Sequence, residues 1–109
     1  GQVWEILCLP DIRFAKDKLT PAYELVSMIN EQMWLGHFEI WSNGGVLLYR
    51  NATILGDDGM LSLGQAQALV EIAVDECDRF YPAFQFVLWG GRTPSEALEA
   101  AMVDAVGEA

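Results

Sequence analysis

Three segments of the chain carry the hydrophobic pattern of β-strands. The first is a short apolar run, and in the second Phe38 and Ile40 alternate with Glu39. The predicted strands span residues 3–9, 37–41 and 46–55. The segment between the last two is Ser-Asn-Gly-Gly, and Asn and Gly readily take the positive φ of a tight turn. The second and third strands are therefore predicted to form a β-hairpin.

Apolar residues with the period of an α-helix mark further segments. The first predicted helix has Thr20 as its N-cap and Pro21 as its first residue, and it stops at Gly36. The second begins at a capping box formed by Ser62 and Gln65. Its apolar stripe consists of Ala66, Leu69, Val70, Ala73, Cys77 and Phe80.

The chain after this stripe contains a proline and then a pair of glycines. Tyr81 and Pro82 are expected to interrupt or redirect the helix, because proline lacks a backbone N–H. The segment 83–89 favours a helix, although its aromatic and β-branched residues would also suit a strand. The two glycines that follow predict a hinge. A second capping box, Thr93 with Glu96, then predicts a last helix.

This order of elements predicts a single α+β domain over residues 1–109, in which helices cover one face of a small antiparallel sheet. The length and the hydrophobic content of 52% fit one packed core. The net charge of −10 argues against binding to nucleic acid or to an anionic membrane surface. No stretch reaches the roughly 18 apolar residues of a membrane span. The chain is therefore expected to bind neither nucleic acid nor membranes.

The cysteines and the single histidine are interpreted as structural residues. Cys8 and Cys77 lie in apolar periodic segments, which predicts two buried thiols in a reducing compartment and hence a cytoplasmic protein. With His37 they do not supply the ligands of a zinc site, and no metal or cofactor is expected. His37 itself is interpreted as a strand-end histidine with hydrogen-bonded partners rather than a catalytic base.

An acidic helix face offers the main alternative chemistry. Three acidic residues of the second helix lie opposite its apolar stripe: Glu71, Asp75 and Asp78. They are interpreted as a solvated face that Arg79 partly neutralises from its position four residues after Asp75. The alternative is a small-ligand or metal sensor, or an enzyme, that uses these carboxylates. Arg50 or Arg92 would then anchor an anion.

The aromatic residues suggest a different function. The chain carries more large rings than a fold of this size is expected to bury, so some are exposed or covered by a partner. Together with the absence of a recognisable catalytic motif, this surplus indicates a non-enzymatic protein-interaction module. Trp41, Phe84 and Trp89 are the predicted contact residues for a polypeptide partner.

Several short segments are distinctive when taken together: residues 30–31, 34–39, 49–50, 77–85, 89–91, 94–98 and 107–109. They resemble the YbjN-like family of bacterial sensory transduction regulators, and the resemblance covers the chain from about Glu5 onward. It implies a fold similar to type III secretion chaperones, with a small twisted antiparallel sheet, and a homodimer. It also implies an N-terminal helix and one or two strands ahead of Val3, which this sequence does not show. The family supplies no catalytic residues.

Overall fold

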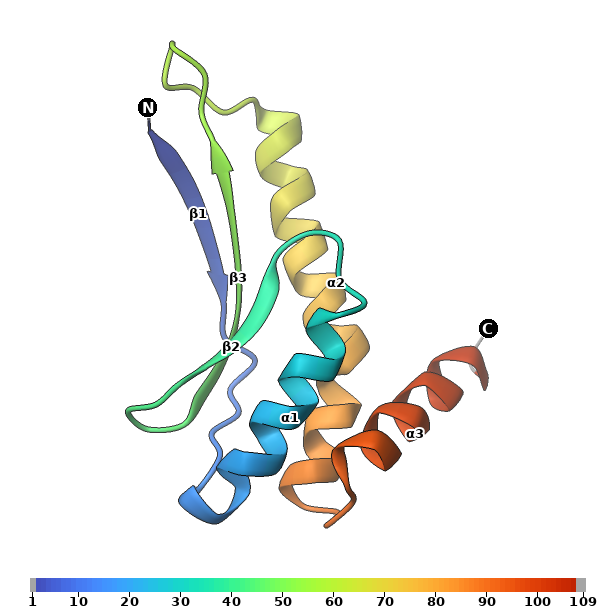
Figure 1. The fold of residues 1–109 in the computed structure, drawn as a ribbon. Coiled ribbons are helices and arrows are strands. Elements are labelled where there is room, and N and C mark those ends of the chain that lie inside the picture. Colours follow the sequence, from blue (N-terminus) through green and yellow to red (C-terminus); the bar gives the residue numbers. More distant parts are fainter. Residues whose placement is uncertain (1, 108–109) are drawn as a thin grey trace.

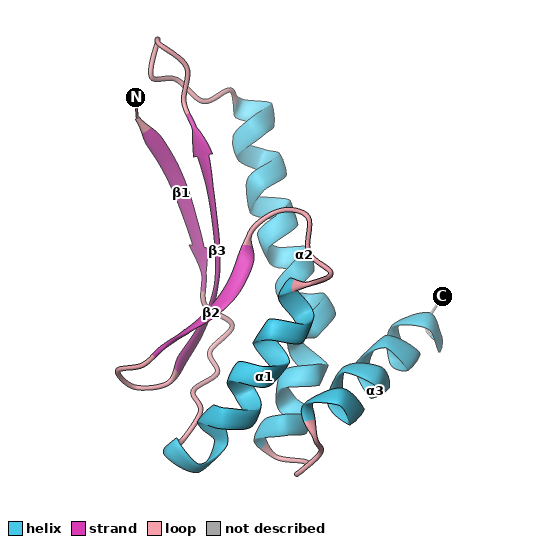
Figure 2. Ribbon diagram, in the orientation of Figure 1, coloured by secondary structure: helices cyan, strands magenta, loops and turns pink. Residues whose placement is uncertain are grey.

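The computed structural model describes the backbone of residues 2–107 and the side chains of residues 2–103. Its main elements are β1 (Val3–Cys8), α1 (Leu19–Asn30), β2 (His37–Trp41), β3 (Val46–Ile54), α2 (Leu63–Leu88) and α3 (Pro94–Gly107). The strands form an antiparallel sheet in the order β1-β3-β2. Helices α1 and α2 pack on one side of this sheet, and α3 packs on the two helices (Figures 1 and 2). The predicted α+β arrangement is confirmed.

The register of the sheet divides its side chains between two faces. In an antiparallel sheet, residues that lie opposite each other point to the same side, and successive residues point to opposite sides. Tyr49 of β3 lies opposite Cys8 and Phe38, and these three side chains face the helices. Arg50, the next residue, lies opposite Leu7 and His37. Its side chain therefore points away from the helices.

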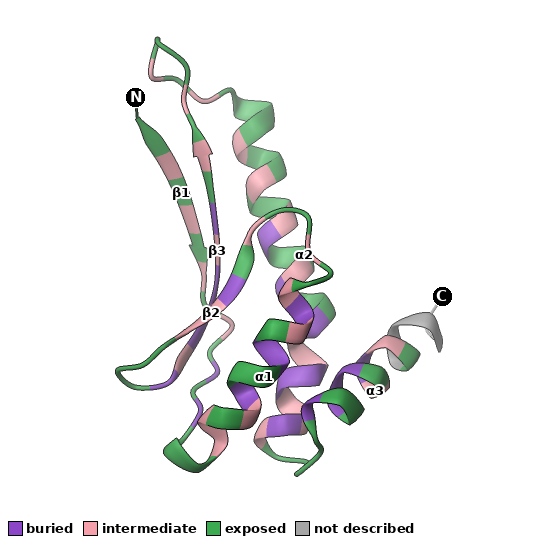
Figure 3. Cartoon of the chain, viewed as in Figure 1, coloured by how far each residue is buried: buried purple, intermediate pink, exposed green. Residues whose placement is uncertain are grey.

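The core between the sheet and the helices is built around aromatic rings. The Phe38 ring lies 5.7 Å from Tyr49, 6.0 Å from Phe80 and 5.2 Å from Phe84, measured between ring centroids. Phe84 also packs against Phe14, at 6.2 Å. All five side chains are at most 3% exposed, and the buried positions of α1, α2 and β3 lie toward the interior in Figure 3. Edge-to-face packing of rings from both layers therefore holds the sheet and the helices together.

Helix α1 begins one residue before the predicted N-cap. It starts at Leu19, so Thr20 lies inside the helix rather than at its cap, and Lys18 precedes it without a capping side chain. A 3₁₀ turn over Lys16–Lys18 leads directly into the helix, so the backbone is already turning when α1 starts. Pro21 fits in the first turn, where backbone N–H groups have no partner within the helix.

Helix α1 ends at Asn30, earlier than the predicted stop at Gly36, and the side chain of this last helical residue binds β2. The Asn30 side-chain amide donates to the carbonyl of Phe38 at 3.0 Å and accepts from the N–H of Phe38 at 2.9 Å. Asn30 thus occupies both backbone groups that Phe38 turns toward α1. Gly36 instead lies just before β2 with a φ of +73°, a conformation that favours glycine.

Helix α2 runs without a break through Pro82, so the predicted interruption at Tyr81 and Pro82 is wrong. Pro82 lacks the N–H that would bond to the carbonyl of Asp78. The buried stripe nevertheless continues on both sides, with Phe80 before the proline and Phe84 after it. Burial of these rings stabilises the helix by more than the missing hydrogen bond costs.

The local signals for the other element ends are confirmed. At α2, the Ser62 hydroxyl accepts from the Gln65 N–H at 3.1 Å and the Gln65 side chain accepts from the Ser62 N–H at 3.2 Å. At α3, the Thr93 hydroxyl accepts from the Glu96 N–H at 3.2 Å and the Glu96 carboxylate accepts from the Thr93 N–H at 3.0 Å. The hairpin turn at residues 42–45 joins β2 to β3 as predicted.

Candidate functional site

The side of the sheet that points away from the helices carries exposed apolar side chains. We call it the open face; its residues are Val3, Glu5, Leu7, His37, Glu39, Trp41, Val46, Leu48, Arg50, Ala52 and Ile54. Val3 and Ile54 are 62% and 82% exposed, and Leu7 and Trp41 are 43% and 42% exposed. Within residues 2–107, no helix covers this side of the sheet (Figure 1). A clustered apolar surface of this kind is typical of an interaction site.

Leu48 is fully buried although its side chain lies on the open face. It lies opposite Glu39 in the central strand and has no exposed surface, yet it is not part of the core cluster on the helix side. The longer side chains around it therefore form a small layer of their own on the open face.

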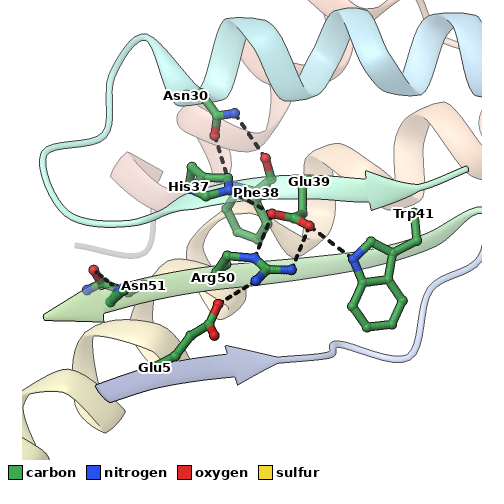
Figure 4. A network of polar contacts seen from close by, with 9 residues as sticks. Glu5, Asn30, His37, Phe38, Glu39, Trp41, Arg50 and Asn51 are labelled. Atoms are coloured by element: carbon green, nitrogen blue, oxygen red, sulfur yellow. Dashed lines mark hydrogen bonds and ion pairs between the residues drawn. The ribbon is translucent and has the colours of Figure 1, made fainter. Parts of the chain in front are cut away.

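An arginine at the centre of the open face joins all three strands. The Arg50 Nε and Nη2 atoms of β3 donate to the two carboxylate oxygens of Glu39 on β2, at 2.8 Å and 3.0 Å. The Arg50 Nη1 atom donates to the carboxylate of Glu5 on β1. Glu39 also binds the His37 ring at 2.8 Å and accepts from the Trp41 indole N–H at 3.0 Å (Figure 4). We call these five residues the Arg50 network.

The ionisation of the network follows from these hydrogen bonds. The Arg50 guanidinium, followed by the His37 and Trp41 side chains, holds the pKa of Glu39 below its ordinary value, although partial burial opposes the shift. Glu39 and Glu5 raise the pKa of Arg50 in turn. The network therefore contains two carboxylates paired with one guanidinium.

The hydrogen bonds of the Arg50 network hold its side chains in fixed positions. A two-point hydrogen bond between a guanidinium and a carboxylate fixes both groups in one geometry. Glu39, so held, orients the Trp41 indole through a further hydrogen bond. A histidine base needs a nucleophilic side chain within hydrogen-bond reach. Among the hydrogen bonds of the described residues, His37 has Glu39 as its partner and no Ser, Thr or Cys.

A glutamine at position 39 tests the ionic character of the network. Because the pKa of Glu39 is lower in the folded chain than its ordinary value of 4.5, ionised Glu39 contributes stability above pH 4.5 that is lost as the pH falls. Glu39→Gln should reduce the free energy of unfolding at pH 7 by about 1 kcal/mol. At pH 3 the free energies of unfolding of the variant and the wild type should differ much less.

The measurement is the melting temperature of both proteins between pH 7 and pH 3. Glu24→Gln is the matched control, since it removes the same charge from an exposed position on α1. An equal pH dependence of wild type and Glu39→Gln would show that the Arg50 pairing does not stabilise the fold.

The structure separates the three predicted contact residues. Trp41 lies in the Arg50 network on the open face, and Trp89 lies directly after α2 with 69% of its surface exposed. Phe84 is 1% exposed in the aromatic core, so it offers no surface to a partner of this protomer, and we leave it out of the contact surface. The expectation that some rings stay exposed is met by Trp34, Trp41 and Trp89.

The sequence interpretation did not identify the Arg50 network. One signal for it was present, because the alternation in the second strand places Glu39 and Trp41 on the same side. The hairpin also brings Arg50 beside that strand. The contribution of Glu5 depends on β3 being the central strand, which the local pattern does not determine.

The acidic helix face is exposed, and its partner differs from the predicted one. Three carboxylates of α2 lie at the surface as predicted: Glu71, Asp75 and Asp78. Arg79 pairs with Glu76, its i, i+3 neighbour, at 3.7 Å rather than with Asp75. Arg50 is paired with two glutamates, and Arg92 lies over the Phe86 ring at 4.5 Å. The described side chains include no group of three that could hold a metal ion.

Comparisons with known proteins place the chain in a family. No helix in the described part of the chain has the length and apolar character needed to cross a membrane. Searches of curated proteins and of solved structures find no significant match. Residues 2–86 match the YbjN family, described as "Putative bacterial sensory transduction regulator". This segment contains the whole sheet, and with it the open face and the Arg50 network. Since the match spans most of its length, the chain belongs to the YbjN family.

Proposed function

We propose that this chain is a non-enzymatic regulatory module that binds a polypeptide partner through the open face. The description of its family as a sensory transduction regulator supports the regulatory role. The observation that carries the proposal is an exposed Trp41 side chain held beside Arg50 by their shared partner Glu39. Trp and Arg are among the residue types most enriched at the energetic centres of protein interfaces.

The geometry of Trp41 favours tight binding. Its indole is already oriented by the hydrogen bond to Glu39, so less side-chain entropy is lost when a partner covers it. Val3, Leu7 and Ile54 extend the apolar contact area across the sheet. The net charge of −10 favours a partner whose own contact surface is rimmed by basic side chains.

We further propose that the chain is a cytoplasmic homodimer that acts in a chaperone-like manner. The sequence resemblance implies a fold similar to type III secretion chaperones and a homodimer, and this implication supports the arrangement. Two free cysteines suit a reducing compartment. A two-fold dimer through the open face would place Trp41 of one protomer against the same surface of its partner, and a polypeptide partner would then bind in place of the second protomer.

Truncation of Trp41 tests the proposed surface. Trp41→Ala should raise the dimer dissociation constant at least about 30-fold, since loss of a central tryptophan costs about 2 kcal/mol or more. Sedimentation velocity over a concentration series measures this constant. Retention of proteins from a bacterial extract on the immobilised chain measures partner binding. Trp41→Ala should lower this retention as well.

Two other tryptophans provide controls. Trp34→Ala removes a 97% exposed ring from the loop between α1 and β2, outside the open face, and should change neither measurement. Trp89→Ala reports whether the end of α2 forms a second contact surface. The proposal is wrong if Trp41→Ala and Trp34→Ala behave alike, or if the wild type stays monomeric and retains no protein.

A further inference from the structure

The two cysteines of the chain meet in one pocket, although they lie on elements far apart in the sequence. Cys8 is the last residue of β1, and Cys77 lies in the middle of α2. The pocket has a volume of about 260 Å³ and is lined by Cys8, Pro10, Val74, Cys77, Asp78 and Tyr81. Only Cys77 is buried as predicted, whereas Cys8 is half-buried. The pocket therefore gives solvent access to one member of a thiol pair.

The two cysteines face the same pocket and both are free. Cys8 and Cys77 both line it, and neither is part of a disulfide. Burial, and then the neighbouring Cys8 side chain, raise the pKa of the Cys77 thiol. The half-buried Cys8 is therefore the thiol that an external reagent meets first, and Cys77 is placed to react second.

We propose that Cys8 and Cys77 form a thiol–disulfide exchange site whose substrate is a small disulfide of the glutathione type. The Cys8 thiolate attacks one sulfur of the disulfide, and the first thiol leaves as a mixed disulfide forms on Cys8. Cys77 then loses its proton and attacks the Cys8 sulfur, which releases the second thiol. Two protein thiols are oxidised to one disulfide, and one small disulfide is reduced to two thiols.

The new bond would change how the fold is held together. It links β1 covalently to α2, and the closed loop contains α1, β2 and β3. A cross-link between residues this far apart restricts the unfolded chain and raises the melting temperature. Disulfides that form in reducing compartments are mostly transient and report the redox state. The site would therefore couple the stability of the sheet edge to the surrounding thiol–disulfide balance.

Oxidation of the intact wild-type chain tests the site. The reduced protein is incubated with oxidised glutathione, digested with trypsin and examined by mass spectrometry. The expected product is a disulfide between the peptides 1–13 and 51–79, which contain Cys8 and Cys77. The intact protein should lose two hydrogen masses and both titratable thiols. Its melting temperature should rise by roughly 10 °C or more and return after treatment with dithiothreitol.

Single substitutions separate an internal bond from general thiol reactivity. In Cys8→Ser the remaining thiol has no partner within the chain, so neither the linked peptides nor the rise in melting temperature should appear. Cys77→Ser should accept one glutathione on Cys8 without further reaction. If Cys77→Ser prevents folding, the oxidation of the wild-type chain alone decides the test. Two persistent free thiols, two glutathione adducts or cross-links between chains in the wild type would each overturn the proposal.

Discussion

Replacing Phe84 with alanine is expected to lower the free energy of unfolding by about 3–5 kcal/mol, which is a large share of the stability of a small domain. The Phe84 ring is 1% exposed and packs against Phe38 on the sheet side and against Phe14, which precedes α1. These neighbours belong to different elements, so they are not free to close the cavity that alanine would leave. Urea denaturation followed by circular dichroism measures the loss.

Trp89→Ala is the matched control for this prediction. Trp89 follows Phe84 by little more than one helical turn, but 69% of its surface is exposed. Its removal should change the free energy of unfolding by no more than about 0.5 kcal/mol. A cost at Trp89 as large as the cost at Phe84 would contradict the assignment of Phe84 to the core and Trp89 to the surface.

Gly36→Ala is expected to destabilise the fold by about 2–5 kcal/mol, although it adds one methyl group. The first part of the cost is the φ of +73°, which an L-residue with a side chain adopts only under strain. The second part is overpacking, because a β-carbon at this position would overlap the phenol of Tyr49 and lie 2.8 Å from the Arg50 carbonyl oxygen. Tyr49 is fully buried and donates to the Leu35 carbonyl at 2.9 Å, so it has little room to move.

Gly64 provides the control for Gly36. It lies in the first turn of α2, and a β-carbon there would meet no atom within 4 Å. Gly64→Ala should therefore be neutral or should stabilise the chain by up to about 1 kcal/mol, since alanine has the higher helix propensity. Thermal unfolding of the two variants beside the wild type gives the comparison. Equal effects would mean that the backbone at Gly36 does not need glycine.

The features that were predictable from the sequence are those encoded within a few residues. The hairpin turn follows from Asn43 and the glycines after it, and α2 begins at Ser62 because Gln65 completes the capping box. These signals involve neighbours along the chain, so no knowledge of the tertiary structure is needed. The apolar periods in the strands and helices add the layer arrangement, because each apolar face must be covered.

The features that were not predictable depend on contacts between distant segments. The continuity of α2 through Pro82 reflects the burial of Phe80 and Phe84 against the sheet, which outweighs the local preference of proline. The attachment of the end of α1 to β2 depends on hydrogen bonds from Asn30 to Phe38, which lies eight residues later.

For the same reason, only part of the candidate site could be predicted from the sequence. Trp41 was identified from its ring alone, whereas its orientation results from Glu39 and Arg50, which meet through the strand register. Phe84 was assigned to the surface because the crowded aromatic segment was expected to exceed the room in the core. The observed core has space for Phe84, since rings from β2 and from the segment before α1 enclose it.

The Asn30 side chain also limits how this sheet can grow. A strand that paired with β2 at Phe38 would have to displace the amide from both backbone groups of this residue. In the described part of the chain, no strand pairs with the outer edge of β1. The Asn30 contact therefore disfavours edge-to-edge association at β2 more than at β1.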